Sequence, residues 1–282
     1  MKISIITINY NDKEGLKNTI ESVVCQTYND IQYIVIDGGS TDGSVDIINQ
    51  YSNKINYWVS ELDKGIYNAM NKGIDVANGE YCLFLNSGDY LFDNKVIERL
   101  VPHLKSEDIV IGRIYFLNGK SYSKINNPIS MLKFYNSSIP HPSTFIKREL
   151  FVSEKYDETL KIVSDWKFFL KKIVIEECSY KIVDNIISCF NSDGISSCNK
   201  LLVDEEREKV LKELIPTAIR MDYLHFTQGE GYSETNYDKL FLKVRQYNYA
   251  SIIYKISLFL VRLISLVKPS AKFARKLPYN KL

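Results

Sequence analysis

Short apolar strands alternate with amphipathic helices over the first 114 residues, and this alternation restricts the fold more than any other feature. Runs rich in Ile, Val, Leu or Tyr predict five strands, at residues 3–8, 31–36, 57–59, 81–85 and 109–114. Apolar residues at helical spacing predict the intervening helices, at residues 16–24, 45–51, 66–77 and 96–104. Such alternation forms right-handed crossovers. We therefore expect an α/β protein with a mainly parallel central sheet and helices on both faces.

The next hundred residues are less regular. Residues 126–142 are rich in Pro, Ser and Asn, which predicts a loop or lid. A helix is expected over 164–173 with Ser164 as its N-cap. A strand should follow over 180–190, and a long amphipathic helix over 201–223.

Residues 226–282 are expected to form a helical tail of different composition. Residues 239–282 contain ten Lys or Arg and no Asp or Glu, whereas the rest of the chain carries a net charge of −8. A basic tail on an acidic body predicts an anionic partner. The apolar segment 250–267 contains Lys255 and Arg262, which are unfavourable in a membrane-spanning helix. We expect it to lie on a membrane surface; packing on the protein's own core or in a homodimer is the alternative.

Composition indicates an ordinary globular protein, with 45% apolar and 25% charged residues. The five cysteines are an odd number and no two are spaced as C-x-x-C, which argues against a disulfide framework or a zinc site. Cys25 and Cys82 fall in helix and strand patterns and are expected to be buried thiols. The N-terminal residues show no secretory signal pattern. These features predict a cytoplasmic protein, peripheral at the inner face of the cytoplasmic membrane, without a nucleic-acid partner.

Two of the predicted strands end in acidic turns. Asp37 follows the strand 31–36, and Asp89 closes the turn after the strand 81–85. Because ligands bind beyond the carboxyl ends of parallel strands, both carboxylates should lie at one edge of the sheet. One can accept a hydrogen bond from uracil N3–H or a ribose hydroxyl, and the other can hold a divalent cation on a diphosphate. This is the layout of an enzyme that uses a sugar nucleotide.

Four motifs resemble, in order and spacing, the family 2 inverting glycosyltransferases: TINYN at 7–11, DGGSTD at 37–42, DKGIYNAMN at 63–71 and NSGD at 86–89. The resemblance is greatest to the branch that builds bacterial exopolysaccharides such as colanic acid, and it covers about residues 1–200. It implies a GT-A fold, here expected over residues 1–225, with a nucleotide diphosphate sugar as donor. It also implies Mg²⁺ or Mn²⁺ as cofactor.

Nucleotide-sugar binding is expected from residues of all four motifs, namely Thr7, Asn9, Asp37, Asp63, Lys64 and Asn86. The resemblance implies that the acids at 37 and 63 contact the nucleoside, and family members often carry a second acid where this chain has Gly38. Lys64 and the following helix N-terminus would neutralise the diphosphate. The alternative is that Asp37 stabilises an Asx-turn or caps a helix, and that Asp63 and Lys64 belong to a salt-bridged surface turn.

Asp89 is the expected metal ligand. The family motif is usually Asp-x-Asp, but Asn86 and Gly88 occupy the acidic positions here, so Asp89 is the sole carboxylate of the turn. Mg²⁺ needs only one or two protein carboxylates when substrate phosphates complete its coordination. A tight turn without a metal is the alternative.

Asp165 is expected to be the general base. The segment VSDWKFFL at 163–170 resembles the motif that begins the acceptor-side helix in this family. An inverting transfer needs one carboxylate to take the proton of the acceptor hydroxyl as its oxygen attacks the anomeric carbon. Trp166 could stack on a sugar or belong to the core, and His141 could contact donor phosphates or acceptor, or have no catalytic role.

The sequence thus predicts a metal-dependent hexosyl- or N-acetylhexosaminyltransferase for capsule or other cell-surface polysaccharide synthesis. A UDP-sugar is the expected donor and a lipid-linked glycan the expected acceptor. A dinucleotide-dependent oxidoreductase would need G-x-G-x-x-G after the first strand, where this chain has NYNDKEG at 9–15. A non-catalytic sugar-nucleotide-binding scaffold stays open because the motif at 86–89 has only one acid.

Overall fold

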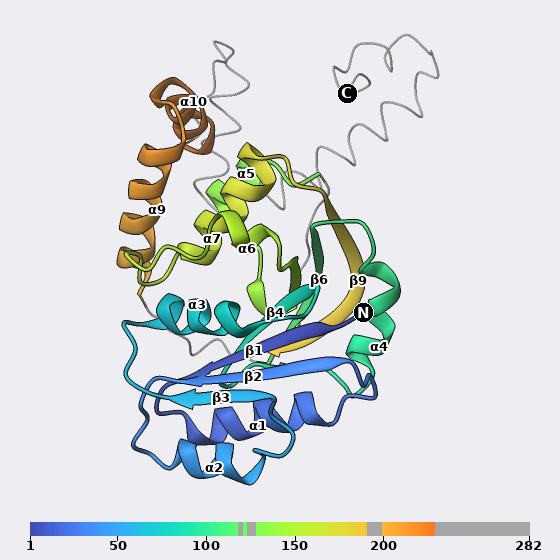
Figure 1. Cartoon of the computed structure of the whole chain (residues 1–282). Coiled ribbons are helices and arrows are strands. Elements are labelled where there is room, and N and C mark those ends of the chain that lie inside the picture. Colours follow the sequence, from blue (N-terminus) through green and yellow to red (C-terminus); the bar gives the residue numbers. More distant parts are fainter. Residues whose placement is uncertain (118–120, 123–127, 191–198, 229–282) are drawn as a thin grey trace, which may run out of the picture. The chain divides into compact units, whose positions relative to one another are not determined.

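The computed structural model describes residues 1–117, 121–122, 128–190 and 199–228 (Figure 1). Met1–Thr217 form one compact unit, and the chain from Ala218 onward belongs to a second. The expected membrane-surface helix at 250–267 lies outside the described residues, as does all of the predicted tail except 226–228. Within the described ranges, no helix has the length and apolar character needed to cross a bilayer.

One mixed sheet organises the first unit. Its strands are β1 (Ile3–Asn9), β2 (Ile31–Asp37), β3 (Tyr57–Ser60), β4 (Tyr81–Asn86), β5 (Tyr90–Leu91), β6 (Ile109–Phe116), β7 (Ser121–Tyr122), β8 (Thr144–Lys147) and β9 (Tyr180–Phe190). Their order is β3-β2-β1-β4-β8-β6-β9-β5, with β7 beside β6. The long pairings β1–β2, β1–β4, β2–β3 and β6–β9 are parallel, while the antiparallel pairings are short. The predicted α/β class and mostly parallel sheet are confirmed.

Helices cover both faces of the sheet (Figure 1). The described residues form the helices α1 (Lys13–Val24), α2 (Ser44–Gln50), α3 (Ile66–Val76), α4 (Val96–Leu100), α5 (Met131–Asn136), α6 (Leu150–Ser153), α7 (Ser164–Phe169), α9 (Lys200–Leu214) and α10 (Thr217–Gln228), of which α10 belongs almost entirely to the second unit. The strands β1 and β2 lie between α1 and α2 on one side and α3 on the other, as the right-handed crossovers require (Figure 1).

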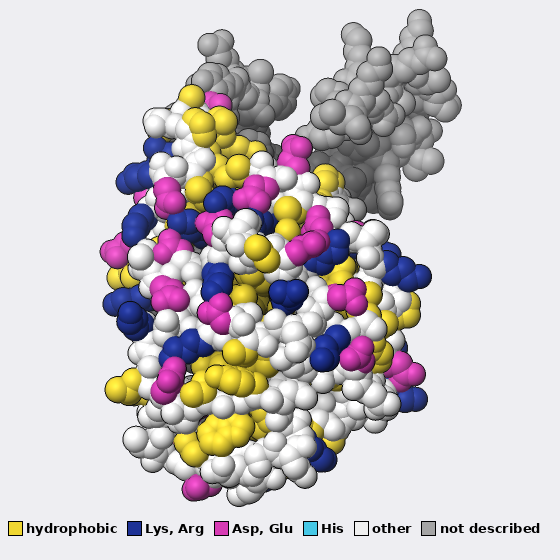
Figure 2. All heavy atoms as spheres, viewed as in Figure 1, with side chains coloured by type: hydrophobic (Ala, Val, Ile, Leu, Met, Phe, Trp, Pro, Cys, Tyr) yellow, Lys and Arg dark blue, Asp and Glu magenta, His cyan; other side chains and the backbone are white. Residues whose placement is uncertain are grey.

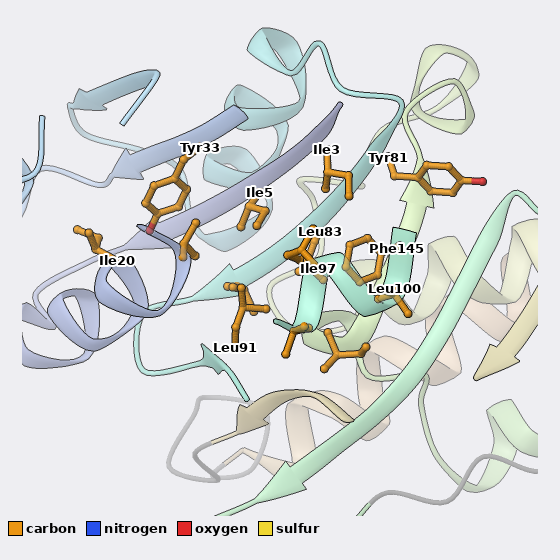
Figure 3. Close-up of a cluster of buried hydrophobic side chains, with 14 of the residues drawn as sticks. Ile3, Ile5, Ile20, Tyr33, Tyr81, Leu83, Leu91, Ile97, Leu100 and Phe145 are labelled. Atoms are coloured by element: carbon orange, nitrogen blue, oxygen red, sulfur yellow. The ribbon is translucent and has the colours of Figure 1, made fainter. Parts of the chain in front are cut away.

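The two faces of the sheet bury different sets of side chains. On the α1 face, Ile3, Ile5, Tyr33 and Leu83 pack in one cluster with Ile97 of α4 (Figure 3). On the α3 face, rings pack edge to face or stack in an aromatic cluster of Phe84, Phe151, Tyr156 and Phe168. Both faces of the sheet are therefore covered by apolar side chains. The polar residues lie at the ends of the strands.

The predicted helix over 201–223 is interrupted. α9 ends at Leu214, Ile215 is extended, and α10 begins at Thr217. Pro216 lacks the backbone N–H that a continuous helix needs, and it disfavours helical geometry at Ile215.

The predicted N-cap at Ser164 is also wrong. Val163 is the N-cap of α7, and Ser164 instead accepts a 2.5 Å hydrogen bond from the backbone N–H of Asp157. Beyond Phe169 the helix widens into a π-helix over Leu170–Ile175. The segment 126–142, expected as a loop, contains α5 and a short 3-10 helix at His141–Ser143 in its described part.

Cys25 is exposed, contrary to expectation, whereas Cys82 is buried as expected. Cys25 is the C-cap residue of α1, beyond the buried stripe that ends at Val23. The four cysteines within the described ranges are free thiols. On the face shown in Figure 2, basic and acidic side chains are intermixed.

Candidate active site

The carboxyl ends of the parallel strands meet at one edge of the sheet. Asn9 of β1 pairs in register with Asp37 of β2, which pairs with Ser60 of β3. Asn86, the last residue of β4, pairs with Ile8 on the other side of β1. The two polar turns that follow β2 and β4 therefore lie beside each other, as the sequence predicted.

The carboxylate of Asp37 organises the first turn. It accepts 2.6 Å hydrogen bonds from Asn9 Nδ2, Ser40 Oγ and Ser60 Oγ. It also accepts from the backbone N–H groups of Ser40 and Gly39, at 2.9 and 3.2 Å. Burial alone would raise the pKa of Asp37, but these donors outweigh it and the pKa is lowered. Asp37 is fully buried and ionised, and its bonds are those of the Asx-turn alternative.

Asn9 joins the two turns. Its Nδ2 donates to Asp37, while its Oδ1 accepts a 2.6 Å hydrogen bond from Ser87 Oγ. Ser87 Oγ also lies 3.0 Å from the carbonyl oxygen of Ile8. Because one amide side chain links the turn after β2 to the turn after β4, a displacement of either turn would disturb the other.

The second turn, Asn86 to Asp89, is fixed by α1. Gly88 has a φ of +90°, a left-handed conformation that favours glycine. Its N–H donates to Thr19 Oγ1 at 3.1 Å, and Thr19 Oγ1 lies 2.7 Å from the carbonyl oxygen of Asp89. The carboxylate-bearing residue Asp89 is only 3% exposed. Thr19 was not predicted to belong to the site, since it lies in the apolar stripe of α1.

Asp63 lies against the first turn. A Cβ atom added at Gly38 would be 2.5 Å from Asp63 Oδ2, so the carboxylate of Asp63 fills the space that a side chain at residue 38 would use. Asp63 Oδ1 accepts a 2.8 Å hydrogen bond from the N–H of Gly65, the N-cap of α3. The neighbouring Lys64 is exposed. Two carboxylates, Asp37 and Asp63, are thus brought to the same turn.

A chain of four polar side chains runs from the second turn to α7. Asn86 Nδ2 is 3.3 Å from His141 Nε2, and His141 Nδ1 is 3.0 Å from Asp165 Oδ2. The single hydroxyl proton of Tyr67 is shared between Asp165 Oδ1, at 2.8 Å, and the carbonyl oxygen of Ile162, at 2.6 Å. The structure therefore brings together the second turn, the loop histidine and the expected base.

Within this hydrogen-bonded network, His141 and Asp165 each favour the charged form of the other. Burial alone would lower the pKa of His141, but the hydrogen bond to Asp165 and the charges of Asp165 and Asp89 raise it overall. Burial alone would raise the pKa of Asp165, but His141 and Tyr67 lower it overall. Asp165 is therefore held as a carboxylate at neutral pH.

Glu206 of α9 fixes the segment before Asp165. Its carboxylate accepts from the backbone N–H groups of Lys161, Ile162 and Val163, at 2.7, 3.0 and 3.3 Å. Glu206 is 8% exposed. It was not predicted, because it lies in a run of charged residues that resembles a solvated helix face.

Two expected site residues do not reach this edge. Thr7 is fully buried two residues before the end of β1, and its hydroxyl is 3.1 Å from that of Tyr33. Trp166 is 1% exposed, and its Nε1 donates to the carbonyl oxygens of Phe134 and Ser137. Trp166 therefore has the environment of the core alternative.

The second turn offers oxygen ligands of the kind that Mg²⁺ and Mn²⁺ prefer. Asn86 Oδ1 is buried and has no hydrogen-bond partner in the part of the chain that the structure describes. Asp89 supplies a carboxylate three residues later. No cluster of three His, Cys, Asp or Glu suited to a metal occurs among the described residues. The residues present thus fit a cation that takes its remaining ligands from a substrate.

The protein has a GT-A-like α/β fold, with a mostly parallel sheet and polar turns at the carboxyl ends of its strands. The family model described as "Glycosyl transferase family 2" matches residues 4–174, and the chain belongs to this family. It is 32% identical over 203 residues to an uncharacterized glycosyltransferase of Mycobacterium tuberculosis, covering 69% of this chain and 77% of that protein. A PGL/p-HBAD biosynthesis glycosyltransferase of the same species is 26% identical over 225 residues, covering 77% and 87%.

Solved structures show the same fold. Residues 1–349 of S. aureus TarS in complex with UDP align with a TM-score of 0.60 and 21% identity, covering 84% of this chain and 74% of that one. This chain spans 46% of the longer TarS structure. A mannosyltransferase of Pyrobaculum calidifontis, in complex with GDP-Man and Mn²⁺, aligns with a TM-score of 0.52 and 16% identity, covering 67% and 56%.

Proposed function

We propose that this protein transfers a sugar, with inversion, from a nucleotide diphosphate sugar to a hydroxyl group of a growing glycan. The observation that carries the proposal is the position of Asp165, whose carboxylate is connected through His141 to the turn that holds Asn86 and Asp89. An ionised base beside a candidate diphosphate site is what an inverting transfer requires.

Asp165 acts as the general base. Tyr67 and His141 each donate to one of its carboxylate oxygens, which fixes the plane of the group. Each carboxylate oxygen can accept more than one hydrogen bond, so the acceptor hydroxyl can donate to the same carboxylate. Asp165 takes the hydroxyl proton as the acceptor oxygen forms its bond to the anomeric carbon and the nucleoside diphosphate leaves.

The donor nucleoside binds at the first turn. Asp37 has its carboxylate occupied by protein donors, whereas Asp63 is partly exposed and lies over Gly38. We therefore assign the direct contact with the base or ribose to Asp63, and the shaping of the turn to Asp37 and Asn9. UDP is the expected nucleotide, and the UDP and UDP-GlcNAc complexes of TarS support this choice. The sugar is a hexose or an N-acetylhexosamine.

The leaving diphosphate binds at the second turn. Asp89 and Asn86 would hold a Mg²⁺ or Mn²⁺ ion there, and the bound ion would neutralise charge that develops on the diphosphate. The N-terminus of α3 and the side chain of Lys64 add positive charge at the same edge. The Mn²⁺ in the Pyrobaculum mannosyltransferase supports a divalent cation.

The acceptor is a lipid-linked glycan of the cell surface, as the resemblance to the exopolysaccharide branch and the basic tail suggest. The tail at 226–282 then holds the enzyme at the inner face of the cytoplasmic membrane. The alternative role for the tail is a homodimer contact.

A donor screen tests the proposal. Thermal stabilisation of the full chain would be measured with UDP-, GDP- and dTDP-sugars, each with Mn²⁺, with Mg²⁺ and with a chelator. Stabilisation by one nucleotide class that needs metal and is lost in Asp89→Asn is expected. Glu61→Gln is the matched control, since Glu61 is exposed and pairs with Lys72. No stabilisation by any nucleotide sugar would contradict the proposal and favour a scaffold.

A further inference from the structure

Arg207 of α9 lies over the ring of Trp166, the residue after the expected base, and it forms no ion pair with another residue that the structure describes. Its guanidinium carbon is 5.1 Å from the centre of the Trp166 ring. Its Nε is buried and has no hydrogen-bond partner among the described residues. The side chain as a whole is partly exposed.

The position of Arg207 relative to Asp165 is fixed from two sides. Trp166, directly after Asp165 in α7, is held by hydrogen bonds from Nε1 to Phe134 and Ser137, and it presents its ring to the guanidinium. Glu206, directly before Arg207, binds the backbone of residues 161–163. These contacts hold α9 and α7 together where the guanidinium lies over the Trp166 ring.

Arg207 and His141 both lie within the electrostatic influence of Asp165. Burial lowers the pKa of Arg207, and the charges of Asp165 and Asp204 act in the opposite sense. His141, on the other side of the network, responds to Asp165 and to Asp89. The charge of Asp165 acts on both groups, whereas Asp89 of the second turn acts on His141.

A half-buried guanidinium without a hydrogen-bonded anion is unfavourable, because burial of charge costs free energy unless the charge is paired. The planar guanidinium matches carboxylate and phosphate oxygens in a bidentate geometry. Stacking on an aromatic ring leaves the edge of the guanidinium available for such bonds. A phosphate or carboxylate group of a ligand would therefore satisfy this guanidinium.

We propose that Arg207 binds a phosphate or carboxylate group of the acceptor, close to the hydroxyl that Asp165 deprotonates. This inference rests on the proposed function, because it takes Asp165 as the base. It narrows the acceptor class to an anionic glycan, either a glycosyl phosphate or a uronic acid. The donor diphosphate is assigned to the opposite side of Asp165, at the second turn.

Tryptophan fluorescence provides a direct test. The chain has two Trp residues, so Trp58→Phe leaves Trp166, under the guanidinium, as the sole reporter. Methyl phosphate, methyl glucuronide and neutral methyl glucoside would be titrated into this full-length variant. A saturable change with at least one anion and none with the neutral glycoside is expected. In Arg207→Gln the anion affinity should fall at least about tenfold, since charge-assisted bonds are lost.

Lys209→Gln is the matched control, because it removes one positive charge from an exposed position of the same helix. It should leave the titration unchanged. The methyl phosphate and methyl glucuronide arms distinguish a phosphorylated acceptor from a uronic acid. Failure of both anions to change the fluorescence, or equal affinity in Arg207→Gln, would overturn the inference.

UDP binding, measured by calorimetry in the same variants, separates this inference from the proposed function. UDP affinity should be the same in Arg207→Gln and in the parent. A tenfold or greater loss would assign the guanidinium to the donor and contradict the acceptor assignment. Absence of UDP binding in the unmutated protein would count against the proposed function. The anion titration would still show whether Arg207 binds an anion, because it does not depend on UDP.

Discussion

His141 Nδ1 lies 3.0 Å from Asp165 Oδ2, although the two residues come from different elements, a 3-10 helix before β8 and the first turn of α7. The other oxygen of Asp165 accepts from Tyr67 of α3. Side chains from the 3-10 helix and from α3 thus orient a carboxylate carried by α7. Such contacts hold a general base in a fixed position.

Replacement of Tyr67 by Phe should raise the pKa of Asp165, because a hydrogen bond that lowers it is removed. The acid limb of the pH profile of kcat/KM should therefore move to higher pH. The free energy of unfolding should fall by about 1–3 kcal/mol, since the carbonyl oxygen of Ile162 loses a donor. Tyr81→Phe is the control, because its hydroxyl donates to Glu107 away from the site. An unchanged pH profile in Tyr67→Phe would argue against Asp165 as the base.

The His141–Asp165 contact should make stability depend on pH in a defined window. The raised pKa of His141 stabilises the fold fully below the ordinary histidine value of 6.5, and this contribution is lost as pH rises through the raised value. The lowered pKa of Asp165 stabilises the fold above the ordinary value of 3.8, and this contribution is lost as pH falls through the lowered value. Both contributions are present between 3.8 and 6.5.

Urea unfolding of the wild type and His141→Gln, in buffer with a chelator, measures this window. The difference in free energy of unfolding should be larger near about pH 5 than near about pH 9. A difference that is constant over this range would mean that the imidazole and carboxylate do not form a charged pair.

Asp37→Ala should be severely destabilising, because it leaves the donors of Asn9, Ser40 and Ser60 inside the turn without their acceptor. A loss of about 1–3 kcal/mol in the free energy of unfolding is expected for each buried donor that is left unsatisfied. Asp42→Ala is the control, since Asp42 is exposed and accepts from the backbone of Lys13 and Ser44. Equal stability of the two variants would refute the structural role of Asp37.

Asp63→Asn should weaken nucleotide binding without that loss of stability, because Asp63 is partly exposed. A decrease in UDP affinity of about tenfold corresponds to one charge-assisted hydrogen bond. Calorimetric titration with UDP and Mn²⁺ would measure it, with Asp46→Asn on the exposed face of α2 as control. Unchanged UDP affinity in Asp63→Asn would contradict the contact between Asp63 and the nucleoside and would favour a purely structural role in the surface turn.

Glu206→Gln should lower kcat more than it changes UDP affinity, because Glu206 acts on Asp165 through the backbone of residues 161–163. Glu205→Gln, at the exposed neighbouring position, should behave like the wild type. If UDP affinity and kcat fell together in Glu206→Gln, a general loss of structure would explain the result better than positioning of the base.

The sequence predicted the edge of the sheet because each strand ends where apolar residues give way to a polar turn. This is why Asn9, Asp37 and Asn86 were expected together, and strand register brings them together. The same reasoning extended the edge too far for Thr7, which lies two residues inside β1 and bonds to Tyr33.

Contacts between distant segments could not be predicted in this way. Tyr67 and Asp165 are 98 positions apart, and nothing in local spacing indicates that they meet. Glu206 and Arg207 lie in a charged run whose pattern is that of an exposed helix, yet one is buried and the other faces Trp166. The break at Pro216, in contrast, follows from proline's backbone chemistry and could have been predicted.

The most direct test of the proposed chemistry measures turnover and donor binding together in Asp165→Asn. Release of UDP from UDP-GlcNAc, with Mn²⁺, would be followed in the absence and presence of glycan acceptors, and UDP affinity would be measured by calorimetry. Loss of a general base should lower turnover by about 10²–10⁴-fold, while UDP affinity stays within a factor of about three because Asp165 is placed on the acceptor side. Wild-type turnover in Asp165→Asn would contradict the assignment of this carboxylate as the base.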